Sequence, residues 1–162
     1  MPRGRSASPP PVSARIAALR MLGRRDLTRA ELVTRLLDRG YPRPDVDDAV
    51  AKLVADRSVD DRRTAASHVR LASRVKGRGR LRIRRELEAR GIEKEVAQAA
   101  VSEISADDDL DAIKRYLERK RLGADVSPAD RRRVFQQLIR RGFSADAIAK
   151  LLRALARDED QS

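Results

Sequence analysis

Gly40, Gly91 and Gly142 stand 51 residues apart, and each closes the same short pattern of side chains. In every copy a leucine lies four positions before the glycine, an arginine directly before it and a large apolar residue directly after it. A period of this size in a chain of 162 residues indicates three copies of one supersecondary unit. The pattern therefore predicts a short array of modules rather than a single enzyme core.

The position of these glycines is typical of the end of a helix. Glycine adopts a positive φ without the steric penalty of a Cβ atom, and the next residue then folds back onto the last helical turn. Such a Schellman stop needs an apolar pair. Three pairs are available: Tyr41 on Leu36, Ile92 on Leu87 and Phe143 on Leu138. We therefore expect one helix to end at each of the three glycines.

Apolar residues recur at helical spacing on both sides of each glycine. The stripe after the glycine comprises Val46, Ala49, Val50 and Leu53 in the first copy, Ala97, Ala100, Val101 and Ile104 in the second, and Ile148, Leu151, Leu152 and Leu155 in the third. The matching positions before the glycine are Leu32, Ile83 and Val134. Each copy also has room for a leading helix, at about 13–22, 61–74 and 108–121.

The signals for helix starts agree with three helices per copy. Residues 27–32 form a capping box with a hydrophobic staple, and Ser127 precedes Pro128 as an N-cap before a proline at the first helical position. No alternation of apolar and polar residues is long enough to predict a strand. The sequence predicts an all-α fold of three tandem three-helix repeats at 14–58, 59–106 and 107–157. A disordered tail at 1–13 and a short acidic tail at 158–162 flank them.

The composition narrows the classes of partner and compartment. The net charge is +12, and 31 arginines against six lysines favour bidentate pairing with phosphate or carboxylate. A GC-rich coding sequence would also give the excess of arginine over lysine, but it does not explain the net charge. Aromatic residues make up only 2%, so each small repeat buries little surface and is expected to depend on its neighbour. No cysteine is present, which excludes disulfides and thiolate metal sites. No membrane span or signal peptide is predicted, and we expect a cytoplasmic monomer.

The densest positive charge lies at residues 70–90, where nine basic residues face two acidic ones. Helical geometry places Arg78, Arg82 and Arg85 together, opposite the apolar Ile83. The equivalent positions of the other copies are not uniformly basic. The fold of the repeat therefore does not require basic residues there. Two interpretations remain: a solvated face that keeps the chain in solution, or a contact surface for an acidic protein or a phosphate backbone. We favour the contact surface.

Other basic residues adjoin this triplet or recur in the outer repeats. The full set of candidate partner-binding or nucleic-acid-binding residues is Arg74, Lys76, Arg78, Arg82 and Arg85, with Arg24, Arg25, Arg131, Arg132 and Arg133 as secondary candidates.

Three further features have structural interpretations. The glycine-containing stretch at 76–80 lacks the spacing of a phosphate loop, so we interpret it as a basic connector. His68, the only histidine, lies mid-helix with no evident set of partners. Acidic clusters at 45–48, 60–61 and 107–109 lie at predicted helix starts, where carboxylates act as caps. One histidine and capping acids make no catalytic constellation, so we predict no enzyme, no cofactor and no metal site.

Several short motifs also occur in a characteristic order. They are 17–22 (Ala-Ala-Leu-Arg-Met-Leu) followed by 25–32, then 59–61 (Val-Asp-Asp), 78–79 (Arg-Gly) leading into 83–92, and 140–144 (Arg-Arg-Gly-Phe-Ser). Together they resemble the RecX family of regulatory proteins over about residues 14 to 157. Two positions depart from that family: Thr64 stands where an aromatic residue is usual, and a glycine is frequent near Arg57.

The resemblance implies a curved, elongated array that lies in the groove of the RecA recombinase filament on single-stranded DNA. There it would suppress ATP hydrolysis, strand exchange and coprotease activity. Weak, salt-sensitive DNA binding is expected both for a filament-binding protein and for a DNA-binding module, so it does not separate them. Two alternatives come from other classes. One is a basic helical DNA-binding module without recombinase specificity, for instance a helix-turn-helix, and the other is a metal-dependent nuclease.

Overall fold

The computed structural model describes residues 12–120 and 127–159, the last five of them as backbone only. Within these ranges the chain forms nine α-helices and one π-helical segment, and no strand. The elements are α1 Ala14–Leu22, α2 Arg29–Asp38, α3 Arg43–Ala55, α4 Asp61–Arg70, the π-helix η1 Leu71–Val75, α5 Arg80–Ala89, α6 Lys94–Ser102, α7 Ala106–Arg119, α8 Pro128–Arg141 and α9 Ala145–Glu159. The predicted all-α fold is confirmed.

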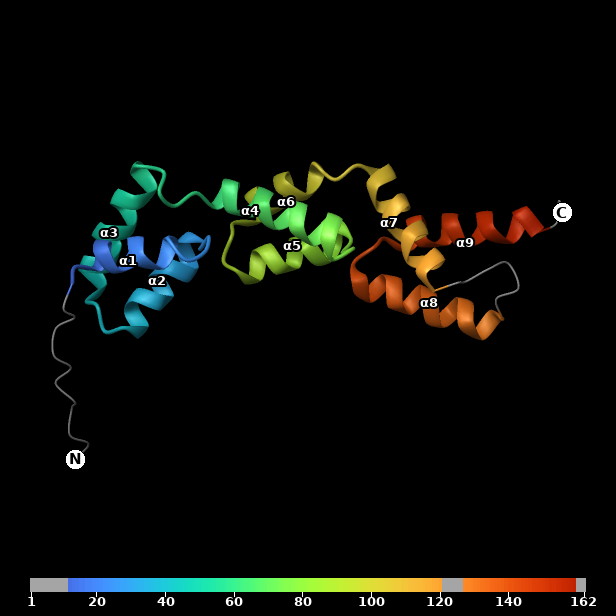
Figure 1. Ribbon diagram of the computed structural model, residues 1–162, viewed down its shortest axis with the longest axis horizontal. Helices are drawn as coiled ribbons and strands as arrows, with labels where there is room; N and C mark the ends of the chain where they lie inside the picture. The colour runs from blue at the N-terminus through green and yellow to red at the C-terminus, as the bar shows by residue number, and fades with distance from the viewer. Residues whose placement is uncertain (1–11, 121–126, 160–162) are drawn as a thin grey trace, which may run out of the picture.

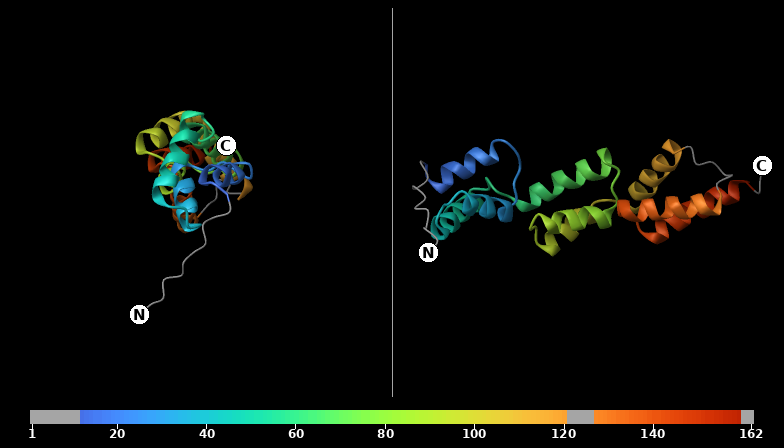
Figure 2. Two further views of the ribbon diagram at one scale, coloured as in Figure 1. Left: turned by 90° about the vertical axis from the view of Figure 1, so that its left-hand side faces the viewer. Right: turned by 90° about the horizontal axis from the view of Figure 1, so that it is seen from below.

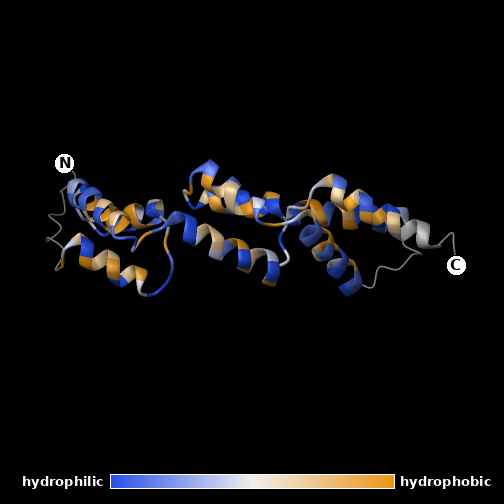
Figure 3. Cartoon of the chain, turned by 90° about the horizontal axis from the view of Figure 1, so that it is seen from above, coloured by the Kyte–Doolittle hydropathy of each residue, from blue (hydrophilic) through white to orange (hydrophobic). Residues whose placement is uncertain are grey.

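The helices form three units arranged in an elongated row, α1–α3, α4–α6 and α7–α9 (Figure 1). Figure 2 shows the same row from below and from one end. In each unit the third helix packs against both of the others. Each unit has a core of its own, and Val59, which the sequence places in the second repeat, is buried in the core of the first. Hydrophobic and hydrophilic residues alternate along the helices, as expected for helices with one buried face (Figure 3).

The three predicted glycine stops are present. Gly40, Gly91 and Gly142 have φ values of +85°, +79° and +93°. The amide after each glycine donates a hydrogen bond to the carbonyl five residues earlier, as Tyr41 does to Leu36 at 3.2 Å. The apolar pairs of all three stops are buried. The repeat in the sequence is therefore a repeat of Schellman motifs.

The two predicted helix caps are also confirmed. Thr28 and Glu31 exchange hydrogen bonds with each other's backbone amides in a capping box at the start of α2. The Ser127 side chain accepts from the Asp130 amide, with Pro128 at the first helical position of α8. The leading helix of the second unit departs from the regular form, because α4 continues into the π-helical turn η1. The predicted start of the third leading helix is two residues late, because Ser105 caps α7.

Neighbouring units meet at a contact that we call a joint. In the first joint the end of α5 packs on the start of α2. The Thr28 hydroxyl donates to the Arg90 carbonyl at 2.7 Å, and the Arg90 guanidinium donates to both carboxylate oxygens of Glu31 at 2.9 and 3.0 Å. A Cβ atom on Gly91 would overlap the side chain of Ala30. The glycine that ends α5 therefore also lets the preceding unit approach.

The second joint repeats this arrangement 51 residues later, between the end of α8 and the start of α5. The Gly79 amide donates to the Arg141 carbonyl at 2.9 Å, and the Leu81 amide donates to the Gly142 carbonyl at 3.1 Å. A Cβ atom on Gly142 would overlap the backbone of Arg82. Thr28 and Gly79 are equivalent positions, as are Arg90 and Arg141. Both joints therefore use the same carbonyl at the same helix end.

Each joint also contains an ion pair, and the two carboxylates respond to it differently. Partial burial acts to raise the pKa of Glu31, but hydrogen bonds from Arg90 and from the Thr28 amide outweigh it, so the pKa lies below its usual value. Asp109 pairs with Arg80 at 2.8 Å across the second joint, and its side chain is only 5% exposed. Burial raises the pKa of Asp109, and Arg80 offsets only part of that rise.

Arg57, in the turn between α3 and α4, has a positive φ of +58°. A side chain in this left-handed region costs about 1 kcal/mol, and glycine avoids that cost. We expect Arg57→Gly to raise the free energy of unfolding by about 1 kcal/mol in urea titration. The control is Arg115→Gly at an exposed position in the middle of α7, where the same change should lower stability by about 1 kcal/mol. A loss of stability in Arg57→Gly would contradict the prediction.

Candidate partner-binding surface

The central basic surface, which comprises Arg74, Lys76, Arg78, Arg82 and Arg85, spans η1, the connection that follows it and α5. These elements lie in the middle unit of the row (Figure 1). Arg78 precedes the helix rather than belonging to it, whereas Arg82 and Arg85 lie in α5. The surface is therefore assembled from two elements.

Glu86 draws two members of the predicted triplet to one point. Arg78 Nη1 lies 2.7 Å from Glu86 Oε2, and Arg82 Nε lies 2.9 Å from Glu86 Oε1. Arg82 also reaches the Arg140 carbonyl of the third unit, at 3.4 Å. Arg85 is exposed and forms no ion pair with a described carboxylate. The structure thus brings Arg78 and Arg82 together around a carboxylate and leaves Arg85 apart from that cluster.

The same carboxylate contacts His68. His68 Nε2 lies 3.0 Å from Glu86 Oε2, so the expectation that His68 has no partner is wrong. Partial burial acts to raise the pKa of Glu86, but hydrogen bonds from Arg82, His68 and Arg78 outweigh it and lower the pKa. Glu86 therefore stays ionised well below neutral pH and offsets one of the positive charges around it.

Exposed positive charge remains at the edges of this surface. Arg74 and Lys76 are exposed and, among the residues described, form no ion pair. Arg74 lies near enough to Asp108 to help lower the pKa of that carboxyl, after the hydrogen bonds from Ser105. The cations available to a partner are therefore Arg74, Lys76 and Arg85 rather than the whole triplet.

The secondary candidates lie in the two outer units. Arg24 and Arg25 follow α1 and are exposed. Arg132 and Arg133 are exposed on α8, and Arg133 lies 3.6 Å from Asp130, while Arg131 on the same helix is half-buried. Sequence reasoning missed three cations that join Arg24 and Arg25, namely Arg20, Arg35 and Arg39. Arg20 and Arg24 stand four residues apart, as do Arg35 and Arg39, and this spacing at the ends of consecutive helices was the available signal.

Two of the three acidic clusters supply caps, as expected. The cluster at 45–48 does not cap α3, because Asp47 pairs with Arg43 and Asp48 with Lys52. Asp60 caps α4, and Asp108 completes a capping box with Ser105. Asp109 differs, because it pairs with Arg80 across the second joint. Within 12–120 and 127–159, no group of three His, Cys, Asp or Glu side chains could hold a metal ion. Across that same part of the chain, no helix is both long and apolar enough to cross a membrane.

Comparisons with known proteins agree on one family. Models of the RecX first and second three-helix domains match residues 14–53 and 60–101. The regulatory protein RecX of Halorhodospira halophila is 40% identical over 154 residues, which cover 91% of this chain and 90% of that protein. The regulatory protein RecX of Geobacillus kaustophilus is 35% identical over 138 residues, and the aligned part spans 51% of its length.

The fold has a solved counterpart. The crystal structure of RecX from Lactobacillus salivarius matches with a TM-score of 0.80 at 23% identity, covering 88% of this chain and 94% of that one. This likeness concerns the arrangement of the helices.

Proposed function

The chain belongs to the RecX family of regulatory proteins, and we propose that it is a negative regulator of the RecA recombinase. In this proposal it binds the RecA filament on single-stranded DNA, along the filament groove, and inhibits ATP hydrolysis, strand exchange and coprotease activity. The observation that carries the proposal is the elongated row of three units joined end to end (Figure 1). Such a row can contact successive subunits of a filament at once, and several linked weak contacts raise avidity without a deep pocket.

The charge distribution supports an acidic partner. The chain carries a net charge of +12, and Arg74, Lys76 and Arg85 on the central unit are exposed without an ion pair to any carboxylate that the structure describes. Arg78 and Arg82 are held by Glu86. We assign Arg85 as the principal contact of the central basic surface, because it is the exposed member of the triplet. Arg78 and Arg82 then serve to position α5 against its neighbours.

The proposal is tested by measuring DNA-stimulated ATP hydrolysis by RecA with increasing amounts of the protein. We expect inhibition that saturates near stoichiometric protein, and unchanged turnover at that amount would contradict the function. Arg85→Glu should weaken inhibition by about tenfold, since the loss of one charged contact costs on the order of 1–2 kcal/mol. The matched control is Arg62→Glu on α4, which changes the same charge at another exposed position.

The same two variants separate the two kinds of contact. Binding is measured to RecA filaments and to bare single-stranded DNA. If Arg85→Glu weakens filament binding alone, Arg85 contacts the recombinase. If it weakens both equally, Arg85 contacts phosphates. If it matches Arg62→Glu in every assay, the assignment of Arg85 is wrong.

A further inference from the structure

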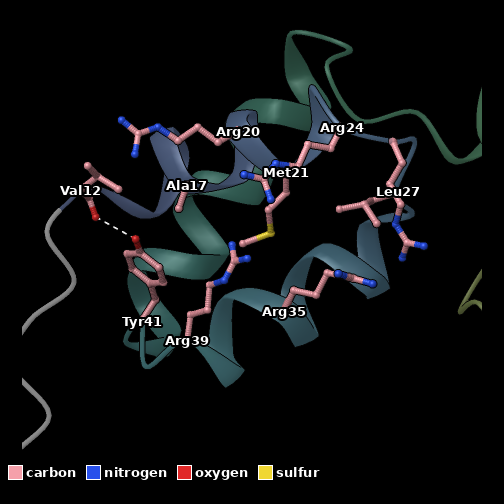
Figure 4. A pocket seen from close by; sticks show the side chains of 10 residues that line it. Val12, Ala17, Arg20, Met21, Arg24, Leu27, Arg35, Arg39 and Tyr41 are labelled. Atoms are coloured by element: carbon pink, nitrogen blue, oxygen red, sulfur yellow. Dashed lines mark hydrogen bonds between the residues drawn. The ribbon is translucent and has the colours of Figure 1, made fainter.

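A groove runs between α1 and α2 of the first unit (Figure 4). It encloses a cavity of about 310 Å³. Its residues come from the chain before α1, from α1, from the turn after it, and from α2 and its end. They are Val12, Ala17, Arg20, Met21, Arg24, Arg25, Leu27, Arg35, Arg39 and Tyr41. The cavity is at the lower end of the range for small-molecule pockets, of about 300–1,000 Å³.

Half of these residues are arginines: Arg20, Arg24, Arg25, Arg35 and Arg39. All five are exposed, and none forms an ion pair with a carboxylate in the described part of the chain. Two other arginines of the first unit do form ion pairs, Arg15 with Asp56 at 3.1 Å and Arg43 with Asp47 at 2.9 Å. Arg25 is near Glu31, but that carboxylate is occupied by Arg90 of the next unit. Arg35, four residues after Glu31 on α2, forms no ion pair with that carboxylate.

The floor of the groove is apolar. Met21 and Leu27 are buried and point into the space between the two helices, and the Tyr41 ring closes one end (Figure 4). The Tyr41 hydroxyl donates to the Val12 carbonyl at 2.9 Å, which holds the ring in place. Arg39 rises from the end of α2 toward α1, and Arg35 extends sideways along α2 (Figure 4). A ligand in this groove therefore meets cations at the rim and apolar, sulfur and aromatic groups below.

This combination constrains the chemistry of the ligand. Guanidinium groups are donors only, so the charged part of the ligand must consist of acceptors, as a phosphodiester does. The apolar floor suits a flat ring that stacks without hydrogen bonds at its edges. We propose that the α1–α2 groove binds single-stranded nucleic acid, with backbone phosphates on the arginines and one base against Met21 and Tyr41.

An acidic peptide fits the groove less well. Its backbone amides are donors that need acceptors, and the side chains lining the groove include no carboxylate, amide or aliphatic hydroxyl. The lining also lacks the asparagine and glutamine side chains that read base edges, so binding should be independent of sequence. This inference concerns bare nucleic acid and the first unit. It therefore stands or falls separately from inhibition of the recombinase.

The test uses the full chain and fluorescence anisotropy of a labelled 12-nucleotide oligo-dT. The variant is Arg35→Gln/Arg39→Gln. Both arginines are exposed, so replacing them does not alter the core. The control is Arg62→Gln/Arg153→Gln, which removes the same charge from exposed positions on α4 and α9. We expect the groove variant to bind about 10–100-fold more weakly and the control about 2-fold. The slope of log affinity against log salt should fall by about 1.4 for two lost phosphate contacts.

Two further probes identify the occupant. An abasic 12-mer should bind the unaltered chain about tenfold more weakly than oligo-dT, since stacking contributes about 1–3 kcal/mol per base. If the abasic strand binds as tightly as oligo-dT, the proposed contact of a base with Met21 and Tyr41 is wrong. If the groove and control variants lose the same affinity for oligo-dT, the groove is not the binding site, and binding depends only on the net charge of the chain. If the groove variant no longer binds a glutamate 12-mer but still binds oligo-dT, the groove is a site for an acidic peptide instead.

Discussion

Replacing Gly142 by alanine is expected to lower the free energy of unfolding by about 3–5 kcal/mol. Its φ of +93° costs an alanine about 1 kcal/mol. The new Cβ atom would also overlap the backbone of Arg82, which cannot move aside as the end of a flexible side chain could. Relieving that overlap opens the second joint and loses the two amide hydrogen bonds to Arg141 and Gly142, at about 1 kcal/mol each.

Gly40 provides a matched control for this variant. It has a φ of +85° and ends α2 in the same way, but a Cβ atom added there would meet no neighbouring atom within 4 Å. Gly40→Ala should therefore cost only the backbone term of about 1 kcal/mol. Urea titration followed by circular dichroism gives both values. Hydrogen exchange at the Gly79 and Leu81 amides gives a local reading, which should accelerate in Gly142→Ala alone. Equal losses in the two variants would contradict the proposed joint.

Replacing Arg80 by methionine should lower the free energy of unfolding by about 2–4 kcal/mol at neutral pH. The change leaves the buried carboxylate of Asp109 without its partner, and an unpaired buried charge is costly. The pKa of Asp109 is already raised by burial and should rise further in the variant. A group whose pKa is raised on folding stabilises the fold below its unfolded pKa and loses that contribution as pH rises through its folded pKa. The deficit should therefore shrink as pH falls.

The comparison that isolates this effect is Arg80→Met/Asp109→Asn. Removing the stranded charge should restore most of the lost stability at pH 7, while Asp109→Asn alone should cost about 1 kcal/mol or less, since Arg80 can be solvated. Urea titration at several pH values gives the difference in free energy of unfolding between each variant and the unaltered chain. A deficit in Arg80→Met that is independent of pH, or is not relieved by the second change, would show that the ion pair is not its cause.

The helix ends were predictable from the sequence because they are local. A glycine stop depends on residues 36–41 or their equivalents, and a capping box such as 28–31 spans one turn, so neighbouring residues contain the necessary information. The capping of α4 by Asp60 and of α8 by Ser127 follows from the same short-range chemistry. The two-residue error at the start of α7 arose from taking Asp108 as the first residue, when it is the partner in a box begun by Ser105.

The candidate sites were less predictable because they depend on contacts between elements. Counting charges made Arg78, Arg82 and Arg85 equivalent, yet two of them converge on Glu86 once η1 and α5 pack together. The Arg82 and Glu86 spacing of four residues was a usable signal for one of these contacts. The partner of Glu31 could not be inferred, because Arg90 lies 59 residues away and reaches it only across the first joint. The groove was equally hard to predict, because its lining residues come together only when α1 and α2 pack.

The joints bear on how a protein of this kind can change its length. The glycine that terminates one helix is also the surface on which the preceding unit rests, and the carbonyl beside it accepts the hydrogen bond that links the two. A duplicated stretch of 51 codons would therefore inherit both halves of its own connector, with no new contact to evolve. An array of this kind can therefore lengthen by tandem duplication as soon as the chain folds with one added repeat. Later substitutions can then change the contacts of each joint separately.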